Sequence, residues 1–100
     1  MGNLCLKNNE DVEFLKESFN ILSEPNRIKI LCLLEKNGAT CVCEIVKFLD
    51  LKQNLVSHHL WMFKRIWIIE SKRDWTKIYY KINQEIFEKL KKLIWNLFNF

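Results

Sequence analysis

Three stretches of the chain decide its fold: Gln53-Asn-Leu-Val-Ser-His-His-Leu-Trp-Met-Phe-Lys-Arg-Ile66, Ile68-Ile-Glu-Ser-Lys72 and Lys77-Ile-Tyr-Tyr-Lys-Ile82. In the first, apolar residues recur every three or four positions, which predicts a helix over residues 53–66 with Val56, Leu60 and Phe63 facing inward. The other two are rich in β-branched and aromatic residues and flank a charged tip at residues 73–76, so they predict a β-hairpin.

Helical periodicity also predicts helices over residues 11–22, 25–36 and 84–99. Gly38 is free to end the second of these in a left-handed conformation, and Thr40 is a suitable N-cap for a short helix that follows. A three-residue turn then leads to the helix over residues 53–66. Two short helices joined by such a turn and followed by a hairpin predict a winged helix-turn-helix, a mainly α fold with a small β-hairpin.

Length and composition limit the class of protein. One hundred residues are enough for a single domain, residues 1–100. With two glycines the chain lacks the phosphate loops of nucleotide-binding enzymes, and it shows no nucleophile–base motif, so we expect no enzyme. The chain has no long apolar run for a membrane and no apolar N-terminal signal, which predicts a cytoplasmic protein with reduced cysteines.

Positive charge is concentrated between residues 52 and 81, where seven Lys or Arg residues face two acidic ones. Such a zone favours a polyanion, usually nucleic acid, although a solvated face with surplus lysines is the alternative. A helix can present its outer residues to base edges in the major groove, and the hairpin can touch the neighbouring backbone or minor groove. The candidate DNA contacts are Gln53, Asn54, Ser57, His58, Trp61, Lys64, Arg65, Lys72, Arg73 and Lys77. His59 faces the other way, as a hydrogen-bonded packing residue.

Four motifs in order closely resemble the ArsR/SmtB family of metal-responsive repressors: Leu22-Ser-Glu-Pro-Asn-Arg-Ile-Lys-Ile-Leu31, Cys41-Val-Cys-Glu-Ile45, Leu55-Val-Ser-His-His-Leu60 and Lys77-Ile-Tyr-Tyr-Lys81. The resemblance implies a homodimer that binds double-stranded operator DNA. It also implies dimerisation through the first and last helices, here residues 1–22 with the N-terminal arm and residues 84–100. The last helix is too apolar for the surface of a monomer, and Trp95 within it is expected in the core or the dimer interface.

Cys41 and Cys43 match the family's Cys-Val-Cys box, in which thiolates hold soft metals or metalloids. The resemblance therefore implies As(III), Pb(II) or Cd(II) as an effector that releases DNA, with Cys5 as a candidate third ligand. Side chains two positions apart on a helix point about 200° away from each other. We therefore expect ion binding to unwind the first turn of the helix that carries the two cysteines and to shift the helix over residues 53–66. The alternatives are a thiol redox pair that needs no metal, or small apolar residues without a ligand. Cys32 is expected to be a packing residue.

Three tryptophans depart from the family pattern. Trp61 occupies an outer helix position that is usually polar or basic, while Trp67 and Trp75 stand where glycine is favoured as a helix cap and in a tight turn. Tryptophan at positive φ costs on the order of 1 kcal/mol, so we expect either an altered backbone or another surface that covers these rings. Exposed indoles also keep open a different function, a protein-interaction or assembly module without specific DNA binding.

Overall fold

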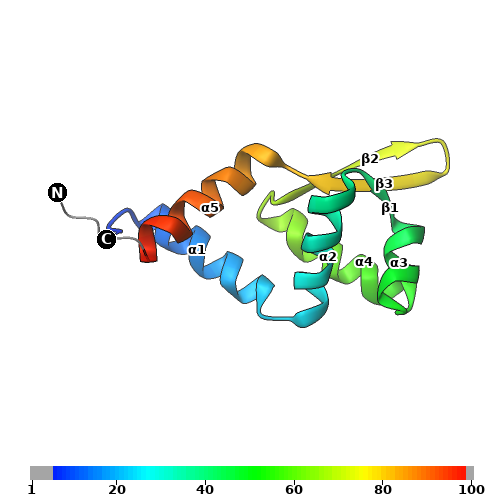
Figure 1. Cartoon of the computed structure of the whole chain (residues 1–100), viewed down its shortest axis with the longest axis horizontal. Helices are drawn as coiled ribbons and strands as arrows, with labels where there is room; N and C mark the ends of the chain where they lie inside the picture. Colours follow the sequence, from blue (N-terminus) through cyan, green and yellow to red (C-terminus); the bar gives the residue numbers. More distant parts are fainter. Residues whose placement is uncertain (1–5, 99–100) are drawn as a thin grey trace.

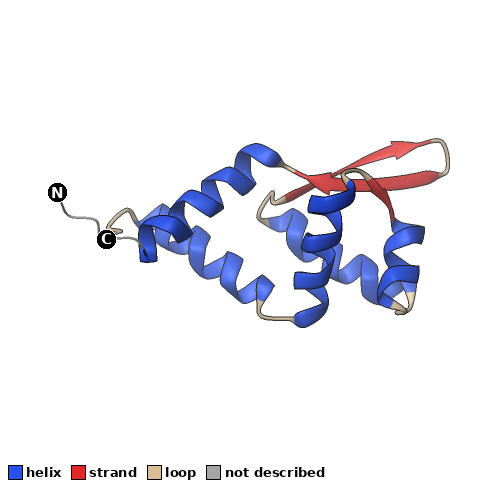
Figure 2. Ribbon diagram, viewed as in Figure 1, coloured by secondary structure: helices blue, strands red, loops and turns tan. Residues whose placement is uncertain are grey.

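The computed structural model describes residues 6–98, which form five helices and three strands (Figures 1 and 2). The elements are α1 (Asn9–Leu22), α2 (Pro25–Asn37), β1 (Thr40–Cys41), α3 (Val42–Leu49), α4 (Gln53–Arg65), β2 (Ile69–Asp74), β3 (Lys77–Ile82) and α5 (Gln84–Phe98). Helices α1 and α5 lie together at one end of the molecule, while α2, α3, α4 and the sheet make up the other (Figure 1). No helix in the described part of the chain is long and apolar enough to cross a membrane.

Helix α2 begins and ends at the residues that the sequence indicates. Pro25 is its first residue, and the backbone N–H of Gly38 donates to the Leu34 carbonyl at 2.9 Å to close its last turn. Gly38 has the expected positive φ of 73°, but its ψ of −144° lies outside the left-handed helical region. Only glycine adopts this combination readily, because a Cβ would be strained there.

The cap of α3 is not Thr40, as predicted, but Cys41. The Cys41 sulfur accepts a hydrogen bond from the Cys43 backbone N–H at 3.2 Å, and the Glu44 carboxylate accepts one from the Cys41 N–H at 3.3 Å. These two bonds form a reciprocal capping box. Thr40 instead lies buried in β1, since pairing with β3 keeps the chain extended for one more residue.

The three strands form one antiparallel sheet in the order β1-β3-β2. The pairs run from Ile69 opposite Ile82 to Asp74 opposite Lys77, which leaves Trp75 and Thr76 as a two-residue turn. The hairpin is therefore the predicted one with a shorter tip. Strand β1 was not predicted, because two residues are too few to show a period.

The core lies between the helices and the base of the hairpin. Its buried apolar residues are Leu15, Ile21, Ile30, Leu34, Ile45, Val56, Leu60, Phe63, Ile68, Ile69, Ile82, Leu90 and Leu93. The expectation that Cys32 is a packing residue is wrong, because Cys32 is exposed on α2. Trp95 is 65% exposed, which excludes the core and leaves the dimer interface as the other predicted place for it. Helices α1 and α5, which lie together at one end of the molecule, carry several exposed apolar residues: Val12, Phe19, Trp95, Leu97 and Phe98.

Candidate nucleic-acid interface and thiol pair

Helix α4 turns a polar face to solvent because its apolar face is held in the core. Val56, Leu60 and Phe63 are each no more than 1% exposed, which confirms the inward set predicted from their spacing. This packing fixes the rotation of the helix. The outward residues of the prediction are all exposed: Gln53, Asn54, Ser57, His58, Trp61, Lys64 and Arg65.

His59 joins α4 to α2 from the buried side. Its Nδ1 accepts a hydrogen bond from Arg27 Nε at 3.0 Å, and Arg27 Nη1 also donates to the Ile21 carbonyl at 3.4 Å. Burial lowers the pKa of His59; Glu24 opposes this, while Arg27 and His58 add to it. A neutral ring with Nδ1 unprotonated is the form that accepts the Arg27 bond. The prediction that His59 is a hydrogen-bonded packing residue is confirmed.

Trp61 does not cover the polar face of α4. Its indole is 57% exposed and lies beside Arg65, whose guanidinium carbon is 5.4 Å from the ring centroid. This is a cation–π contact along the helix. Residues 53, 54, 57 and 58 stay exposed. No part of the described chain therefore blocks a partner molecule from reaching the N-terminal half of α4.

The hairpin carries the remaining candidate contacts. Lys72, Arg73 and Lys77 are all exposed. Lys72 lies opposite Tyr79 and Arg73 opposite Ile78, so the two cations project from opposite faces of the hairpin. The Lys64 Nζ donates to Ser71 Oγ at 3.0 Å and thereby ties β2 to the C-terminal part of α4. We call the hairpin, residues 69–82, the wing.

Trp67 and Trp75 keep the backbone that glycine would favour. Their φ angles are 63° and 61°, and their side chains are 69% and 90% exposed. Of the two alternatives, an altered backbone is therefore wrong at both positions. No part of the described chain covers either ring, which leaves both indoles open to another molecule.

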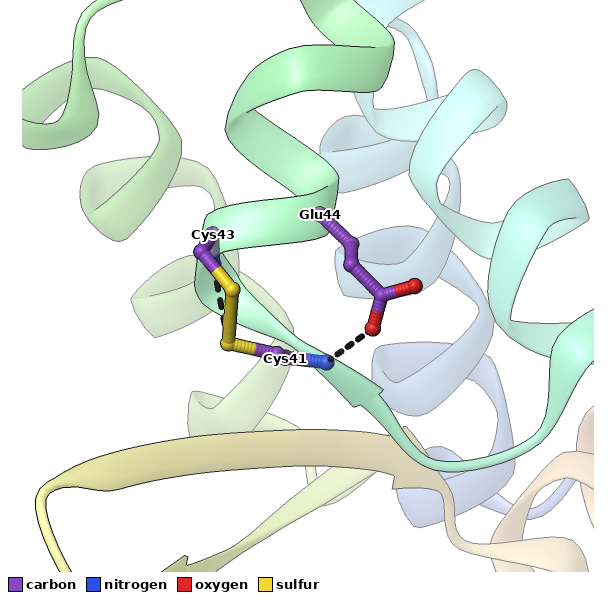
Figure 3. Close-up of a disulfide and its surroundings, with 3 residues drawn as sticks. All are labelled: Cys41, Cys43 and Glu44. Atoms are coloured by element: carbon purple, nitrogen blue, oxygen red, sulfur yellow. Dashed lines mark hydrogen bonds between the residues drawn. A yellow bond between two sulfur atoms is a disulfide. The ribbon is translucent and has the colours of Figure 1, made fainter.

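The two thiols of the Cys-Val-Cys box meet at the start of α3 (Figure 3). Cys41 and Cys43 form a disulfide, with their Cα atoms 5.2 Å apart. The sequence argument that an unwound turn is needed to bring the sulfurs together is wrong, because Cys41 lies outside the helix with an extended backbone, φ −68° and ψ 145°. An N-cap residue and the second helical residue can point to the same place, as Cys41 Sγ and the Cys43 N–H also show.

The described residues supply two sulfur donors at this place and no third ligand. No group of three or more His, Cys, Asp or Glu residues suited to a metal occurs among residues 6–98. The neighbouring Glu44 carboxylate already caps the Cys41 N–H. Cys5, the candidate third ligand, lies outside the described residues.

The thiol pair lies between the wing and α3, the helix that packs against α4. Cys41 pairs with Tyr79 and Thr40 with Tyr80, so β1 adds a third strand to the wing at β3. The next residue begins α3, which packs against α4. Sequence reasoning missed the link to the wing, because it joins residues almost 40 positions apart.

A polar helix held by a short helix and a turn, followed by a basic β-hairpin, defines a DNA-binding winged helix-turn-helix. Residues 24–64 match the family described as "Bacterial regulatory protein, arsR family". The chain belongs to this family of transcriptional regulators, as its four motifs indicate.

Two sequence relatives support this membership. The chain is 34% identical over 85 residues to an uncharacterized HTH-type transcriptional regulator, MJ1325, of Methanocaldococcus jannaschii, covering 85% of this chain and 96% of that protein. It is 35% identical over 74 residues to the cadmium resistance transcriptional regulatory protein CadC of Listeria innocua. That alignment covers 74% of this chain and only 62% of CadC.

Solved structures share the fold. The transcriptional repressor PagR of Bacillus anthracis superimposes with a TM-score of 0.71 at 31% identity, covering 87% of this chain and 99% of that one. A homodimeric winged helix-turn-helix DNA-binding domain, Mb0332 of Mycobacterium bovis, gives a TM-score of 0.73 at 23% identity, with 94% and 86% covered.

Proposed function

We propose that this protein is a homodimeric repressor that binds double-stranded operator DNA and releases it when Cys41 and Cys43 take up As(III), Pb(II) or Cd(II). One observation carries the proposal. The two sulfurs lie together at the joint between β1, which pairs with the wing, and α3, which supports the recognition helix α4.

The DNA contacts follow from the exposed face of α4. With this helix in the major groove, the amides of Gln53 and Asn54 are suited to adenine edges, and Ser57 and His58 to bases or phosphates. Lys64 and Arg65 are suited to flanking phosphates, near the exposed ring of Trp61. The wing cations reach the adjacent backbone or minor groove: Lys72, Arg73 and Lys77.

A dimer would place two α4 helices on one operator. The exposed apolar residues of α1 and α5 support self-association at residues 1–22 and 84–100, so that residues 1–100 act as one domain with a dimerising end. The two recognition helices then enter successive major grooves, about 34 Å apart along the duplex.

The sensor would act through reduced thiols. A thiophilic ion is an electrophilic centre, and it binds thiolates in preference to harder donors such as carboxylates. Cys41 would exchange its cap bond from the Cys43 N–H for that ion, which disturbs the first turn of α3 and the end of β1 together. Cys5 is the proposed third ligand. CadC, a regulator of cadmium resistance by name, supports a soft-metal effector.

Ultraviolet titration tests the sensor. Adding Cd(II), Pb(II) or As(III) to the fully reduced protein should produce a thiolate-to-metal absorption band that is absent from the C41S/C43S double variant. Cys32→Ser is the matched control, because Cys32 is an exposed cysteine remote from the pair in sequence, and it should leave the band unchanged. If Cys5→Ser weakens the band, the third ligand is Cys5. If reduced protein gives no band with any of the three ions, the sensor proposal is wrong.

The disulfide itself favours a second candidate, a redox regulator that needs no metal. Two thiols become one disulfide by releasing two electrons and two protons, which a peroxide accepts as it is reduced to water. In that case oxidation alone, in the presence of a chelator, should change DNA affinity, and C41S/C43S should abolish the change.

A further inference from the structure

The tip of the wing carries an indole that the repressor mechanism above does not use. Trp75 and Thr76 form the two-residue turn between Asp74 and Lys77. Positive φ occurs at Trp75 and not at Thr76, which is the pattern of a type II′ turn, whose first position favours glycine. The ring is 90% exposed, so no contact within the described chain offsets the strain.

Positive charge surrounds this indole. Lys72 and Arg73 project from opposite faces of the hairpin, and Lys77 follows the turn. Asp74 is the single carboxylate among residues 72–77. At the base of the hairpin, by contrast, Lys81 is 3.5 Å from Glu70 and is neutralised by it. The free cations therefore lie toward the tip, where a polyanion is the partner that they fit.

The wing projects in the right place for such a partner. Figure 1 shows the tip of the hairpin extending beyond the helices at the end of the molecule opposite α1 and α5. The base of the wing is anchored by the buried residues Ile69 and Ile82, and the Lys64–Ser71 hydrogen bond links β2 to α4. The turn presents a single flat indole at its tip, and a flat ring can enter a minor groove about 6 Å wide.

We propose that Trp75 is a wedge that inserts between two base pairs from the minor groove and kinks the duplex. Lys72, Arg73 and Lys77 would hold the phosphates on either side. Apolar side chains used in this way unstack one base step and bend DNA by about 20–90° toward the major groove. The proposal rests on the proposed DNA-binding function and adds to it a bend of the operator.

Two glycine variants of the full chain test the wedge. Trp75→Gly removes the indole and gives the turn its favoured residue, and Trp67→Gly does the same at the other exposed tryptophan with positive φ. The probe is a duplex from the region upstream of the protein's own gene, with bending measured by circular-permutation gel mobility and by energy transfer between labelled ends. Melting temperature is measured for each variant.

We expect Trp75→Gly to lose the bend and about tenfold of affinity, the effect of one lost base–aromatic stack, without any fall in melting temperature. Trp67→Gly should keep the bend, and Trp75→Phe should keep most of it. If Trp75→Gly binds and bends the duplex as the unchanged protein does, the wedge is wrong while the repressor proposal stands. If the unchanged protein binds no DNA, both proposals are wrong. A change in self-association on sedimentation with an unchanged bend would make the tip a protein contact and also overturn the wedge.

Discussion

Acidification should weaken the packing of the recognition helix α4 against α2 through protonation of His59. Burial lowers the pKa of this residue in the folded protein, so the unfolded chain binds the extra proton first as the pH falls. Stability from the neutral ring is complete above the unfolded pKa of about 6.5 and is lost as the pH falls through the lower native value. Protonation also replaces the Nδ1 acceptor of Arg27 by a donor, which breaks the 3.0 Å bond between α2 and α4.

The size of this effect has an upper limit. One proton contributes a slope of at most about 1.4 kcal/mol per pH unit in the window below pH 6.5. In a domain of this size, about 1 kcal/mol corresponds to roughly 4–8 °C in melting temperature. Titration of His59 should therefore lower the free energy of unfolding below pH 6.5, by at most about 1.4 kcal/mol between pH 6.5 and 5.5.

Urea unfolding followed by circular dichroism at pH 7.5 and pH 5.5 measures the slope. His59→Gln keeps a carbonyl that can accept from Arg27 and removes the titration, so its unfolding free energy should change less between the two pH values. His58→Gln is the matched control, because it also removes one imidazole but keeps the Arg27–His59 bond; the His59 titration should remain, with a pKa lowered less than in the unchanged protein. Equal pH dependence in the His59→Gln variant and the unchanged protein would refute the reasoning.

Three further predictions concern stability and salt. Phe63→Ala should destabilise the protein by about 3–5 kcal/mol in urea unfolding, since Phe63 is 1% exposed and belongs to the core cluster. A loss below about 1 kcal/mol would mean that α4 does not pack into the core in this way. Gly38→Ala should lower the unfolding free energy by about 1 kcal/mol or more, because φ 73° strains any residue with a side chain. Steric crowding adds nothing to this loss, since no atom lies within 4 Å of the added Cβ, and unchanged stability would contradict the positive φ. DNA affinity should fall steeply with salt, and Lys72→Ala should reduce the log–log slope by about one; an affinity that ignores ionic strength would contradict phosphate contact.

Local patterns of the sequence predict most of the fold. Val56, Leu60 and Phe63 lie within two turns of one helix, so their spacing alone identifies the buried face of α4 and, by exclusion, the exposed one. The β-branched and aromatic residues at 68–72 and 77–82, on either side of a charged tip, likewise identify the hairpin. The glycines that the family favours at positions 67 and 75 indicate positive φ there, and Trp67 and Trp75 keep it, so the altered backbone is the wrong one of the two alternatives.

The features that sequence reasoning missed depend on long-range contacts. Cys41 caps α3 because β1 pairs with β3 across nearly 40 residues, and no local signal distinguishes it from Thr40. That pairing brings the two sulfurs together and links them to the wing. The exposure of Cys32 likewise depends on how α2 packs, which the apolar character of the helix does not determine.

Operator affinity of the reduced protein, measured with and without effector ion, tests the central claim most directly. Using a duplex from upstream of the protein's own gene, we predict that Cd(II), Pb(II) or As(III) lowers affinity by at least about tenfold, equivalent to about 1.4 kcal/mol of coupling between the two sites. The C41S/C43S variant should bind the duplex as tightly as the unchanged protein and ignore all three ions, while Cys32→Ser should respond normally. An ion effect that survives in C41S/C43S, or tight binding by the unchanged protein that no ion disturbs, would contradict the account.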